Sequence, residues 1–505
     1  MSARARGGVA LVGAGPGDPG LLTLKAARAI AHCDVLVYDY LAAAPIVALA
    51  RPDCEKMYVG KKAGAHTLSQ DEINALLVRL GREGRKVVRL KGGDAFVFGR
   101  GGEEAEALVD AGLSFEVIPG ISSALAAPAY AGIPLTHRSH NAAFTVATGH
   151  EDPLKGTSTL DFARLANPAQ TLVLLMAMTN LREIAERLQA NGLPGDTPVA
   201  VVREGTKPQQ ETLVATLQTI ADEAERSGMT APAVIVIGEV VRLRDRLRWF
   251  DAHPLFGKRI LLTRARGDGD DLAARLWEAG AEPLVAPTIA IAPPDDPSPA
   301  EIAVREARIF HWIVFTSRYG VEAFFDRLSA SGGDARALGD VSLAAIGPKT
   351  AEQLMRHGVR ADFVPPRYVG EEIAAGLLER TEPGARILLY RAQDARDVLP
   401  DMLREEGRRV DSVAAYKTAV VHDAAIAEAA AAADVWTFTS ASTVRGFLEN
   451  VPDAVRLSAG KTIACIGPVT AEAARETGLR VDVVPEHYTY EGLFDALETA
   501  FARAR

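Results

Sequence analysis

The sequence has few of the features that mark secreted, membrane or nucleic-acid-binding proteins. Its 505 residues include only three cysteines, and Cys33, Cys54 and Cys465 have neither disulfide nor metal-site spacing. No apolar run approaches the ~18 residues that span a bilayer, and the basic tail at residues 1–8 lacks a signal-peptide core. The formal net charge of −9 argues against a nucleic-acid-binding surface. We therefore expect a cytoplasmic protein whose ligands are small molecules, with no nucleic-acid or membrane partner.

Glycine, by contrast, is concentrated where strand-like runs end. In VVRLKGGDAFVFGRGG (residues 87–102) an apolar run ends on Lys91, Gly92, Gly93 and Asp94, and a second glycine-rich turn follows. Glycine permits positive φ and lets a ligand approach main-chain N–H and C=O groups. Asp94 adds an acceptor for a hydroxyl or ammonium group. Because open α/β sheets bind ligands at the carboxyl ends of their strands, this loop predicts a binding site, although an ordinary glycine-rich turn is the alternative.

The same arrangement recurs along the N-terminal half. Strand-like runs at 9–12, 35–38, 57–59 and 115–118 also end on polar or glycine-rich loops, and helix-like stretches such as 21–31 and 70–82 separate them. This alternation predicts right-handed βαβ crossovers and a mainly parallel sheet. Such a sheet would bring Asp39, Lys61 and Asp94 to one edge. A sheet that needed only stability has no reason to gather them there.

The segment GAGPGD invites a dinucleotide-binding interpretation. Gly13 and Gly15 fit the G-x-G-x-x-G fingerprint, and Asp39 follows about 20 residues later, where a ribose-binding acid would stand. The third glycine position, however, is Asp18, and Pro16 removes an N–H from the turn that would hold a pyrophosphate. These departures argue against NAD.

A break near residues 251–257 divides the chain. We expect one domain at residues 1–251, a linker at 252–256 and a second domain at 257–505. Within the first domain, residues 136–141 form a hinge between lobes at about 8–135 and 142–250. Strand-like runs of the second lobe lie at 143–147, 171–175, 199–202 and 233–241. Two lobes with facing loop edges predict a cleft that binds a small molecule.

Residues 8–245 resemble the uroporphyrinogen-III C-methyltransferases of the tetrapyrrole methylase family. The resemblance rests on GAGPGDPGLLTLKA, VYDYL, VGKKAG, LKGGDAFVFGRGGEE, PGISSALAAPAYAGIPLTHR and TGH. Ala95 and Ser123 depart from the residues that relatives usually carry. The resemblance implies homodimers and a bound S-adenosylmethionine, which would be held by Pro16, Gly92, Gly93, Asp94, Val97, Ser122, Ser123, Met176 and Gly205.

The implied reaction moves two methyl groups from a sulfonium sulfur to pyrrole carbons. By resemblance, Asp39 accepts a proton and Lys61 donates one, whereas taken alone they could be a helix N-cap and a surface lysine. The substrate carries eight carboxylates, so the binding region should be cationic. Arg100 and Arg138 are the principal candidates for binding it, and Lys62 and Arg203 are further candidates. His137 and His140 lack an evident third ligand, so no metal is expected.

The C-terminal half contains an internal repeat. RILLTRA at 259–265 returns as RILLYRA at 386–392, and FTS at 315–317 returns at 438–440. AIGPKTAEQL at 345–354 likewise matches CIGPVTAEAA at 465–474. Two units of about 123 residues therefore predict two similar α/β lobes. Hydroxyl groups and free helix N–H groups at their strand ends suit a ligand with several carboxylates.

Residues 256–505 resemble uroporphyrinogen-III synthases. The resemblance implies one lobe from 257–288 plus 421–505, another from 300–413, and a two-stranded connector from 287–299 and 414–420. It also implies conversion of hydroxymethylbilane into the ring with inversion of the last pyrrole. Tyr416 matches a tyrosine that assists hydroxyl departure, or it anchors the connector. The candidates for substrate binding are Ser317, Thr350, Ser440 and Thr470.

Together the two resemblances predict a bifunctional α/β enzyme of the sirohaem or cobalamin branch. It would make uroporphyrinogen III and methylate it to precorrin-2. Two alternatives remain open at this point. In one, the C-terminal half is an inactive tetrapyrrole-binding or regulatory module; in the other, the chain is a nicotinamide oxidoreductase with a sensor-like lobe pair.

Overall fold

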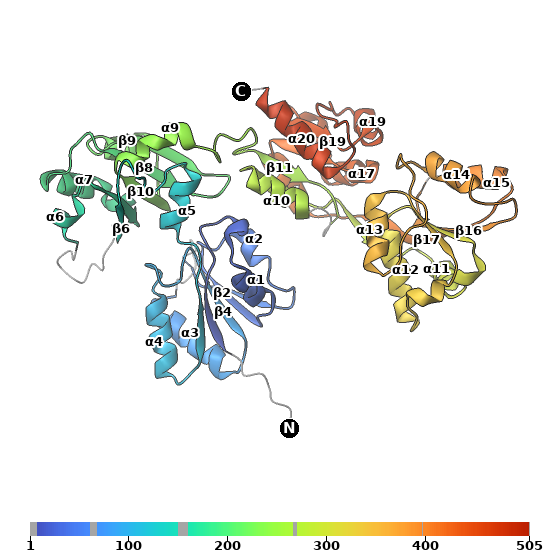
Figure 1. Cartoon of the computed structure of the whole chain (residues 1–505), viewed down its shortest axis with the longest axis horizontal. Helices are drawn as coiled ribbons and strands as arrows, with labels where there is room; N and C mark the ends of the chain where they lie inside the picture. The colour runs from blue at the N-terminus through green and yellow to red at the C-terminus, as the bar shows by residue number, and fades with distance from the viewer. Residues whose placement is uncertain (1–7, 61–67, 150–159, 266–269, 396, 504–505) are drawn as a thin grey trace. The chain divides into compact units, whose positions relative to one another are not determined.

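The computed structural model describes residues 8–60, 68–149, 160–265, 270–395 and 397–503. It divides into two compact units (Figure 1): residues 1–260 with 271–283 and 494–505, and residues 261–270 with 284–493. Strands and helices alternate along the chain, and the strands form four sheets, which confirms the predicted α/β class. Among the helices of these ranges, none is long and apolar enough to cross a membrane.

The sequence predicted a mainly parallel sheet for the first lobe. The observed sheet is wholly parallel, with the strand order β3-β2-β4-β1-β5. Its strands are β1 (Val9–Gly13), β2 (Val35–Tyr38), β3 (Glu55–Tyr58), β4 (Val87–Lys91) and β5 (Phe115–Ile118). Its main helices are α1 (Leu24–Ala31), α2 (Ala44–Val47), α3 (Gln70–Arg82) and α4 (Gly101–Asp110). Helix α1 begins three residues later than predicted, because Thr23 provides its N-cap and a short 3-10 turn precedes it.

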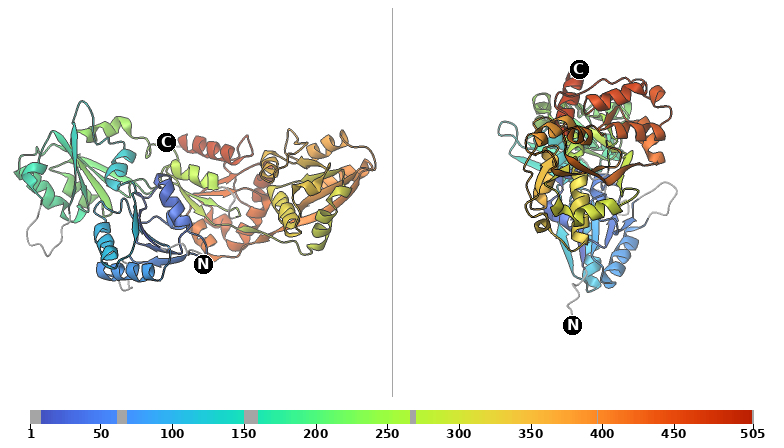
Figure 2. Two further views of the ribbon diagram at one scale, coloured as in Figure 1. Left: turned by 60° about the horizontal axis from the view of Figure 1, so that its bottom comes forward. Right: turned by 90° about the vertical axis from the view of Figure 1, so that its right-hand side faces the viewer.

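Helices cover both faces of this sheet (Figures 1 and 2). Ile30 of α1 and Ile46 of α2 pack with Leu36 and Leu90 on one face. Leu77 of α3 and Leu108 of α4 belong to the core of the other face. Because both faces are buried, strands β1 and β2 are almost continuously apolar, and polar groups follow at their ends.

The second lobe has a mixed sheet with the order β6-β7-β10-β8-β9. Its strands are β6 (Ala143–Thr148), β7 (Gln170–Leu175), β8 (Pro198–Arg203), β9 (Glu211–Thr216) and β10 (Ala233–Ile237), and its main helices are α5 (Ser123–Tyr130), α7 (Leu181–Ala190) and α8 (Ile220–Arg226). The predicted run at 233–241 is too long, because Gly238 adopts a φ of 140° and ends the strand. The edge strand β9, which is largely half-buried or exposed, was not predicted.

The C-terminal half contains two further sheets, with orders β12-β11-β18-β19 and β13-β17-β16-β14-β15. The strands are β11 (Arg259–Leu262), β12 (Glu282–Val285), β13 (Ile289–Ala292), β14 (Trp312–Phe315), β15 (Ser342–Ala345), β16 (Arg386–Ala392), β17 (Arg409–Val420), β18 (Val435–Phe438) and β19 (Thr462–Cys465). The main helices are α10 (Asp270–Glu278), α11 (Ser298–Arg305), α12 (Arg318–Ala330), α13 (Pro348–Arg356), α14 (Gly370–Leu378), α15 (Val398–Glu405), α16 (Ala424–Ala432), α17 (Ala441–Asn450), α19 (Pro468–Glu476) and α20 (Tyr490–Ala502).

The sequence repeat is a structural repeat. An isolated bridge joins Ala344 to Phe363 in one copy, and the same bridge joins Ala464 to Val483, each residue shifted by 120 (344 to 464 and 363 to 483). Strand β13 pairs antiparallel with the end of β17, from Ile289 opposite Val420 to Ala292 opposite Lys417. This pairing is the predicted two-stranded connector.

The cysteines are small core residues. Cys33 and Cys54 are buried, and their Sγ atoms lie 3.4 Å apart as free thiols, a proximity that the spacing in the sequence did not indicate. Burial, together with Cys54, raises the pKa of Cys33 to about 12, and burial raises that of Cys465 to about 12. Both groups are therefore protonated near neutral pH and are poor nucleophiles.

Candidate active sites

Strained backbone marks three loops of the N-terminal half. In the described part of the chain, the non-glycine residues with positive φ are Phe98 (54°), Arg100 (57°), Met176 (54°), Glu204 (48°) and Thr206 (73°). All of them follow the carboxyl ends of β4, β7 or β8. Such conformations cost about 1–3 kcal/mol each and cluster at ligand-binding sites. The strain therefore lies in the segments that were predicted to bind a cofactor, around Gly92–Val97, Met176 and Gly205.

Close glycine contacts lock the loops after β1, β4 and β5 together. Gly15 N donates to Gly93 O at 3.0 Å, and Gly93 N donates to Gly15 O at 2.7 Å. A Cβ on Gly120 would lie 2.3 Å from the Gly93 oxygen, and one on Gly13 would lie 2.5 Å from the Gly120 nitrogen. A side chain at either position would therefore push the loops apart.

Gly120→Ala should lower the free energy of unfolding by about 1–3 kcal/mol, the usual effect of overpacking. The matched control is Gly102→Ala in helix α4, where a Cβ meets nothing within 4 Å. The control should be neutral or stabilising, since alanine is the better helix former. Urea denaturation of both variants measures the difference, and equal stabilities would contradict the contact.

Asp94 organises the loop in which it lies. Its Oδ1 accepts from the Phe96 N–H at 2.8 Å, and its Oδ2 accepts from the Gly120 N–H at 3.0 Å. Ser122 is buried, and its hydroxyl accepts from the Ala124 N–H at the start of α5, next to Ser123. These two predicted cofactor-binding side chains thus shape the backbone that a ligand would meet.

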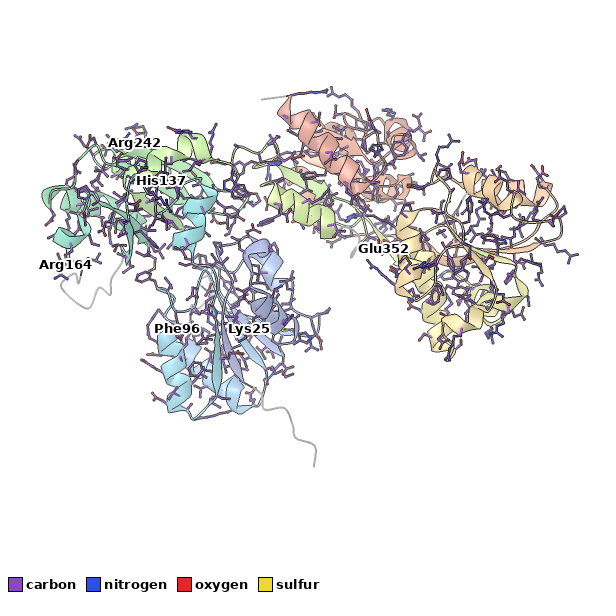
Figure 3. The ribbon with its side chains drawn as sticks, viewed as in Figure 1. Lys25, Phe96, His137, Arg164, Arg242 and Glu352 are labelled. Carbon is purple, nitrogen blue, oxygen red and sulfur yellow. The ribbon has the colours of Figure 1, made fainter. Side chains whose placement is uncertain are left out.

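Apolar side chains accompany this polar backbone. Phe96 (labelled in Figure 3) is 53% exposed, Val97 is 40% exposed and Met176 is 49% exposed. On Gly92, a Cβ would lie 2.4 Å from the Leu41 side chain, so glycine permits this close packing. Exposed apolar groups beside a glycine-rich backbone suit a ligand with a flat ring system and a few polar atoms.

Asp18, the residue that breaks the dinucleotide fingerprint, connects the two lobes. Its N–H donates to Thr206 Oγ1 at 3.2 Å, and its Oδ2 accepts from the Tyr130 hydroxyl at 2.6 Å. Burial and the neighbouring Asp18 raise the pKa of Tyr130. A buried carboxylate at position 18 would repel a pyrophosphate. The residue at the third fingerprint position therefore disfavours a dinucleotide. Pro16, two residues earlier, is half-buried.

Asp39 lies at the end of β2, where its carboxylate is held from both sides. Oδ1 accepts from the Leu41 N–H at 3.1 Å, and Oδ2 accepts from Arg89 Nη2 at 3.0 Å. The side chain is 20% exposed. It is not a helix N-cap, because α2 begins only at Ala44.

A buried ionic network supports Asp39, and sequence reasoning missed it. Arg89 Nε donates to Glu104 Oε1 at 3.1 Å, and Lys91 Nζ donates to the same oxygen at 2.8 Å. Glu104 is fully buried, and burial together with Arg89 lowers the pKa of Lys91. The available signal was the presence of two charged residues in the otherwise apolar run VVRLK, all five of which are buried.

The predicted cationic residues of this half have different surroundings. Arg100 forms a bidentate pair with Glu103 at 2.7 and 2.8 Å, and Arg203 pairs with Glu211 at 3.0 Å. Arg138 is exposed. Lys61 and Lys62 lie outside the described residues. The His137 and His140 rings are 5.0 Å apart, and the described residues contain no group of three metal-ligating side chains.

The C-terminal candidates occupy equivalent places in the two repeats. Ser317 and Ser440 cap α12 and α17, where their hydroxyls accept from Gly320 N and Thr443 N. Thr350 and Thr470 are each only 5% exposed, so their hydroxyls are covered. Lys349 and Val469, one residue earlier in each helix, are exposed.

Tyr416 is the titratable candidate of the C-terminal half. It is 8% exposed, and its hydroxyl donates to Ser317 Oγ at 2.9 Å. Burial raises its pKa, and the bond to Ser317 partly opposes this shift. The phenol therefore remains protonated near neutral pH, as a proton donor must be. Tyr416 belongs to β17, and its hydroxyl meets Ser317 beyond the end of β14.

Family models match both halves of the chain. Residues 8–221 match the model for Tetrapyrrole (Corrin/Porphyrin) Methylases, and residues 270–495 match that for Uroporphyrinogen-III synthase HemD. The porphyrin biosynthesis protein HemD of Ruminiclostridium josui is 38% identical over 495 residues, which are 97% of this chain and 97% of that protein. The chain belongs to the family of this porphyrin biosynthesis protein HemD. It joins a tetrapyrrole methylase to a uroporphyrinogen-III synthase, as both motif sets predicted.

Two further relatives match the methylase half. An S-adenosyl-L-methionine-dependent uroporphyrinogen III methyltransferase of Methanosarcina barkeri is 53% identical over 241 residues, 48% of this chain and 94% of that protein. A siroheme synthase of Azotobacter vinelandii is 51% identical over 249 residues, 49% of this chain, and the match spans about half (53%) of that relative. Because the chain belongs to the porphyrin biosynthesis family, the alternative of a nicotinamide oxidoreductase is not supported.

Proposed function

We propose that the protein cyclises hydroxymethylbilane to uroporphyrinogen III and then transfers two methyl groups to that ring, which gives precorrin-2. The observation that carries this proposal is the fusion, because the product of one half is the substrate of the other. In this proposal the catalytic domains are residues 1–251 and 257–505, joined by residues 252–256. The siroheme synthase relative supports the sirohaem branch.

S-adenosylmethionine fits the N-terminal loops as the methyl donor. When bound, it supplies an electrophilic methyl group on a sulfonium sulfur. The glycines of the loops after β1, β4 and β5 would let the ligand approach the backbone closely, and Val97 and Met176 would contact its apolar parts. Positioning of the reactants can supply up to ~7–11 kcal/mol of the barrier reduction. The strained, tightly packed loops are suited to that task.

Asp39 is the proposed proton acceptor of the methyl transfer. Its Oδ2 accepts a hydrogen bond from Arg89, and the Leu41 N–H bonded to Oδ1 fixes its orientation. Arg89 is fixed in turn by Glu104. Lys61 remains the proposed proton donor.

In the C-terminal half, the ring closure begins when the bilane loses its terminal hydroxyl group. That group needs a proton to depart as water, and Tyr416 is the proposed donor. Its hydroxyl is already oriented by Ser317. The lobes would hold the flexible chain in a folded form, so no single residue need dominate the rate.

Tyr416→Phe should lower kcat for cyclisation by about tenfold, less than the ~10²–10⁴ of a dominant acid. The matched control is Tyr319→Phe, because the Tyr319 ring packs edge-to-face with Tyr416 at 5.7 Å. Initial rates with hydroxymethylbilane measure both. If Tyr416→Phe loses stability but keeps its kcat, the residue only anchors the connector.

Separate assays of the two half-reactions test the proposed function. Supplied with uroporphyrinogen III and S-adenosylmethionine, the protein should release S-adenosylhomocysteine and a dimethylated ring. Supplied with hydroxymethylbilane alone, it should form the type III ring faster than the buffer control. Methyl transfer without cyclisation would instead support an inactive, regulatory C-terminal half.

A further inference from the structure

Arg264 is a buried arginine that forms no ion pair with any residue that the structure describes. It stands two residues beyond strand β11 and is 3% exposed. Neither Nη1 nor Nη2 has a hydrogen-bond partner in the part of the chain that the structure describes. The guanidinium carbon lies 4.3 Å from the centroid of the Tyr490 ring. A ring face only partly offsets the loss of hydration of a buried guanidinium, so this arrangement leaves a need for an anion.

The repeat supplies an internal comparison. Arg391 holds the position of Arg264 in the second copy, since RILLYRA aligns with RILLTRA. Arg391 is also buried, but its Nε donates to Ser412 Oγ at 2.7 Å and its Nη2 donates to Asp397 Oδ1 at 2.5 Å. One copy therefore pairs its arginine with a carboxylate of the chain, whereas Arg264 has no such partner among the residues placed by the structure.

A second cation contacts the same aromatic ring. Lys349 Nζ lies 4.6 Å from the centroid of Tyr490, and Lys349 is exposed in the first turn of α13. The N-cap of α13, Gly347, makes no side-chain bond, and the first turn contains no acidic residue. The positive end of the helix and the ammonium group repel each other, and an anion placed between them would relieve the repulsion. The equivalent residue in the other copy is Val469, so this feature also belongs to one copy alone.

We propose that Arg264, Lys349 and Tyr490 form a binding site for one carboxylate of an acidic tetrapyrrole. In the free protein the Tyr490 ring covers both cations. On binding, a carboxylate replaces the ring as the partner of Arg264, because a guanidinium and a carboxylate form two parallel charge-assisted hydrogen bonds. The identification of the ligand as a tetrapyrrole rests on the proposed synthase function. The acetate and propionate side chains of the bilane are groups of this kind.

Arg264→Met tests the site in the full-length protein, because the change removes the charge and keeps most of the volume. If Arg264 gains its anion only from a bound ligand, the apparent Tm of the ligand-free Arg264→Met protein should equal or exceed that of the wild type. Meanwhile KM for hydroxymethylbilane should rise at least about tenfold, the effect of losing a hydrogen bond to a charged group. The matched control is Arg391→Met, which should lower the apparent Tm, since Asp397 and Ser412 lose their partner.

Lys349→Met provides a second test that does not depend on a buried substitution. This exposed change should leave the apparent Tm unaltered and raise KM by about threefold, as expected for a partly screened charge. Titration with uroporphyrin III, a stable octacarboxylate, compares the affinities of the variants without any turnover. An Arg264→Met protein that loses as much Tm as Arg391→Met, or that keeps the wild-type affinity for uroporphyrin III, overturns the proposal. Failure of the wild-type protein to cyclise the bilane would refute the synthase function, while the titration still reports on the site.

Discussion

Asp39→Asn should lower the rate of methyl transfer by about 10²–10⁴-fold, the usual contribution of a positioned general base. Asparagine keeps the shape of the side chain and still accepts the Leu41 N–H, but it cannot take up a proton. The affinity for S-adenosylmethionine should therefore be nearly unchanged. Single-turnover methyl transfer and equilibrium binding of S-adenosylmethionine measure the two effects separately.

The matched control for Asp39 is Asp53→Asn in the same lobe. The Asp53 side chain is 72% exposed and lies 3.5 Å from Arg51. This change should affect neither rate nor affinity. If Asp39→Asn lost affinity for S-adenosylmethionine in proportion to its loss of rate, Asp39 would hold the ligand and would not be the base.

Glu104→Gln should lower the free energy of unfolding by about 3–5 kcal/mol, the usual effect of removing one partner of a buried ionic network. The substitution leaves Arg89 and Lys91 buried next to a neutral amide. Arg89 would then lose part of its support, and methyl transfer should fall as well, because Arg89 orients Asp39. Urea denaturation and methyl-transfer rates measure these two effects.

The neighbouring residue supplies the control for Glu104. Glu103 pairs with Arg100, and the two side chains are 50% and 56% exposed. Glu103→Gln should change stability by no more than ~0.5 kcal/mol, as expected for an exposed ion pair. Equal losses in the two variants would show that the buried network does not support the lobe.

The sequence predicted those elements whose ends coincide with residues that commonly end strands or cap helices. Strands β2 and β5 and helix α3 lie at the predicted residues, since Asp39 and Pro119 follow the two strands and Ser69 caps the helix. Strand β9 was missed, because its burial comes from pairing with β8 at the edge of the sheet and not from its own pattern.

Side-chain partners could not be predicted from the sequence, because they depend on register and on distant loops. Arg89 lies 50 residues from Asp39, and Asp18 meets Tyr130 across 112 residues. Likewise, GPKT and GPVT suggested exposed hydroxyls, whereas the first turns of α13 and α19 direct Thr350 and Thr470 into buried positions. The motifs therefore pointed to particular loops, and only the fold shows which side chains of those loops are covered.

The repeat also shows how two similar lobes can differ in function. Arg264 and Arg391 are equivalent in the two sequence repeats, yet Arg264 contacts an aromatic ring and Arg391 pairs with an acid of the chain. Both copies of the repeat therefore retain a buried arginine, and in our proposal only Arg264 binds an external carboxylate. Sequence alignment of the copies finds the arginines but not this difference.

The most direct test of the bifunctional proposal is a single incubation of the full-length protein with hydroxymethylbilane and S-adenosylmethionine, followed by mass spectrometry of the tetrapyrroles. The account predicts that a ring of type III carrying two added methyl groups accumulates, with two S-adenosylhomocysteine molecules released per ring. Accumulation of unmethylated ring, or of only the type I isomer that arises without an enzyme, would contradict it.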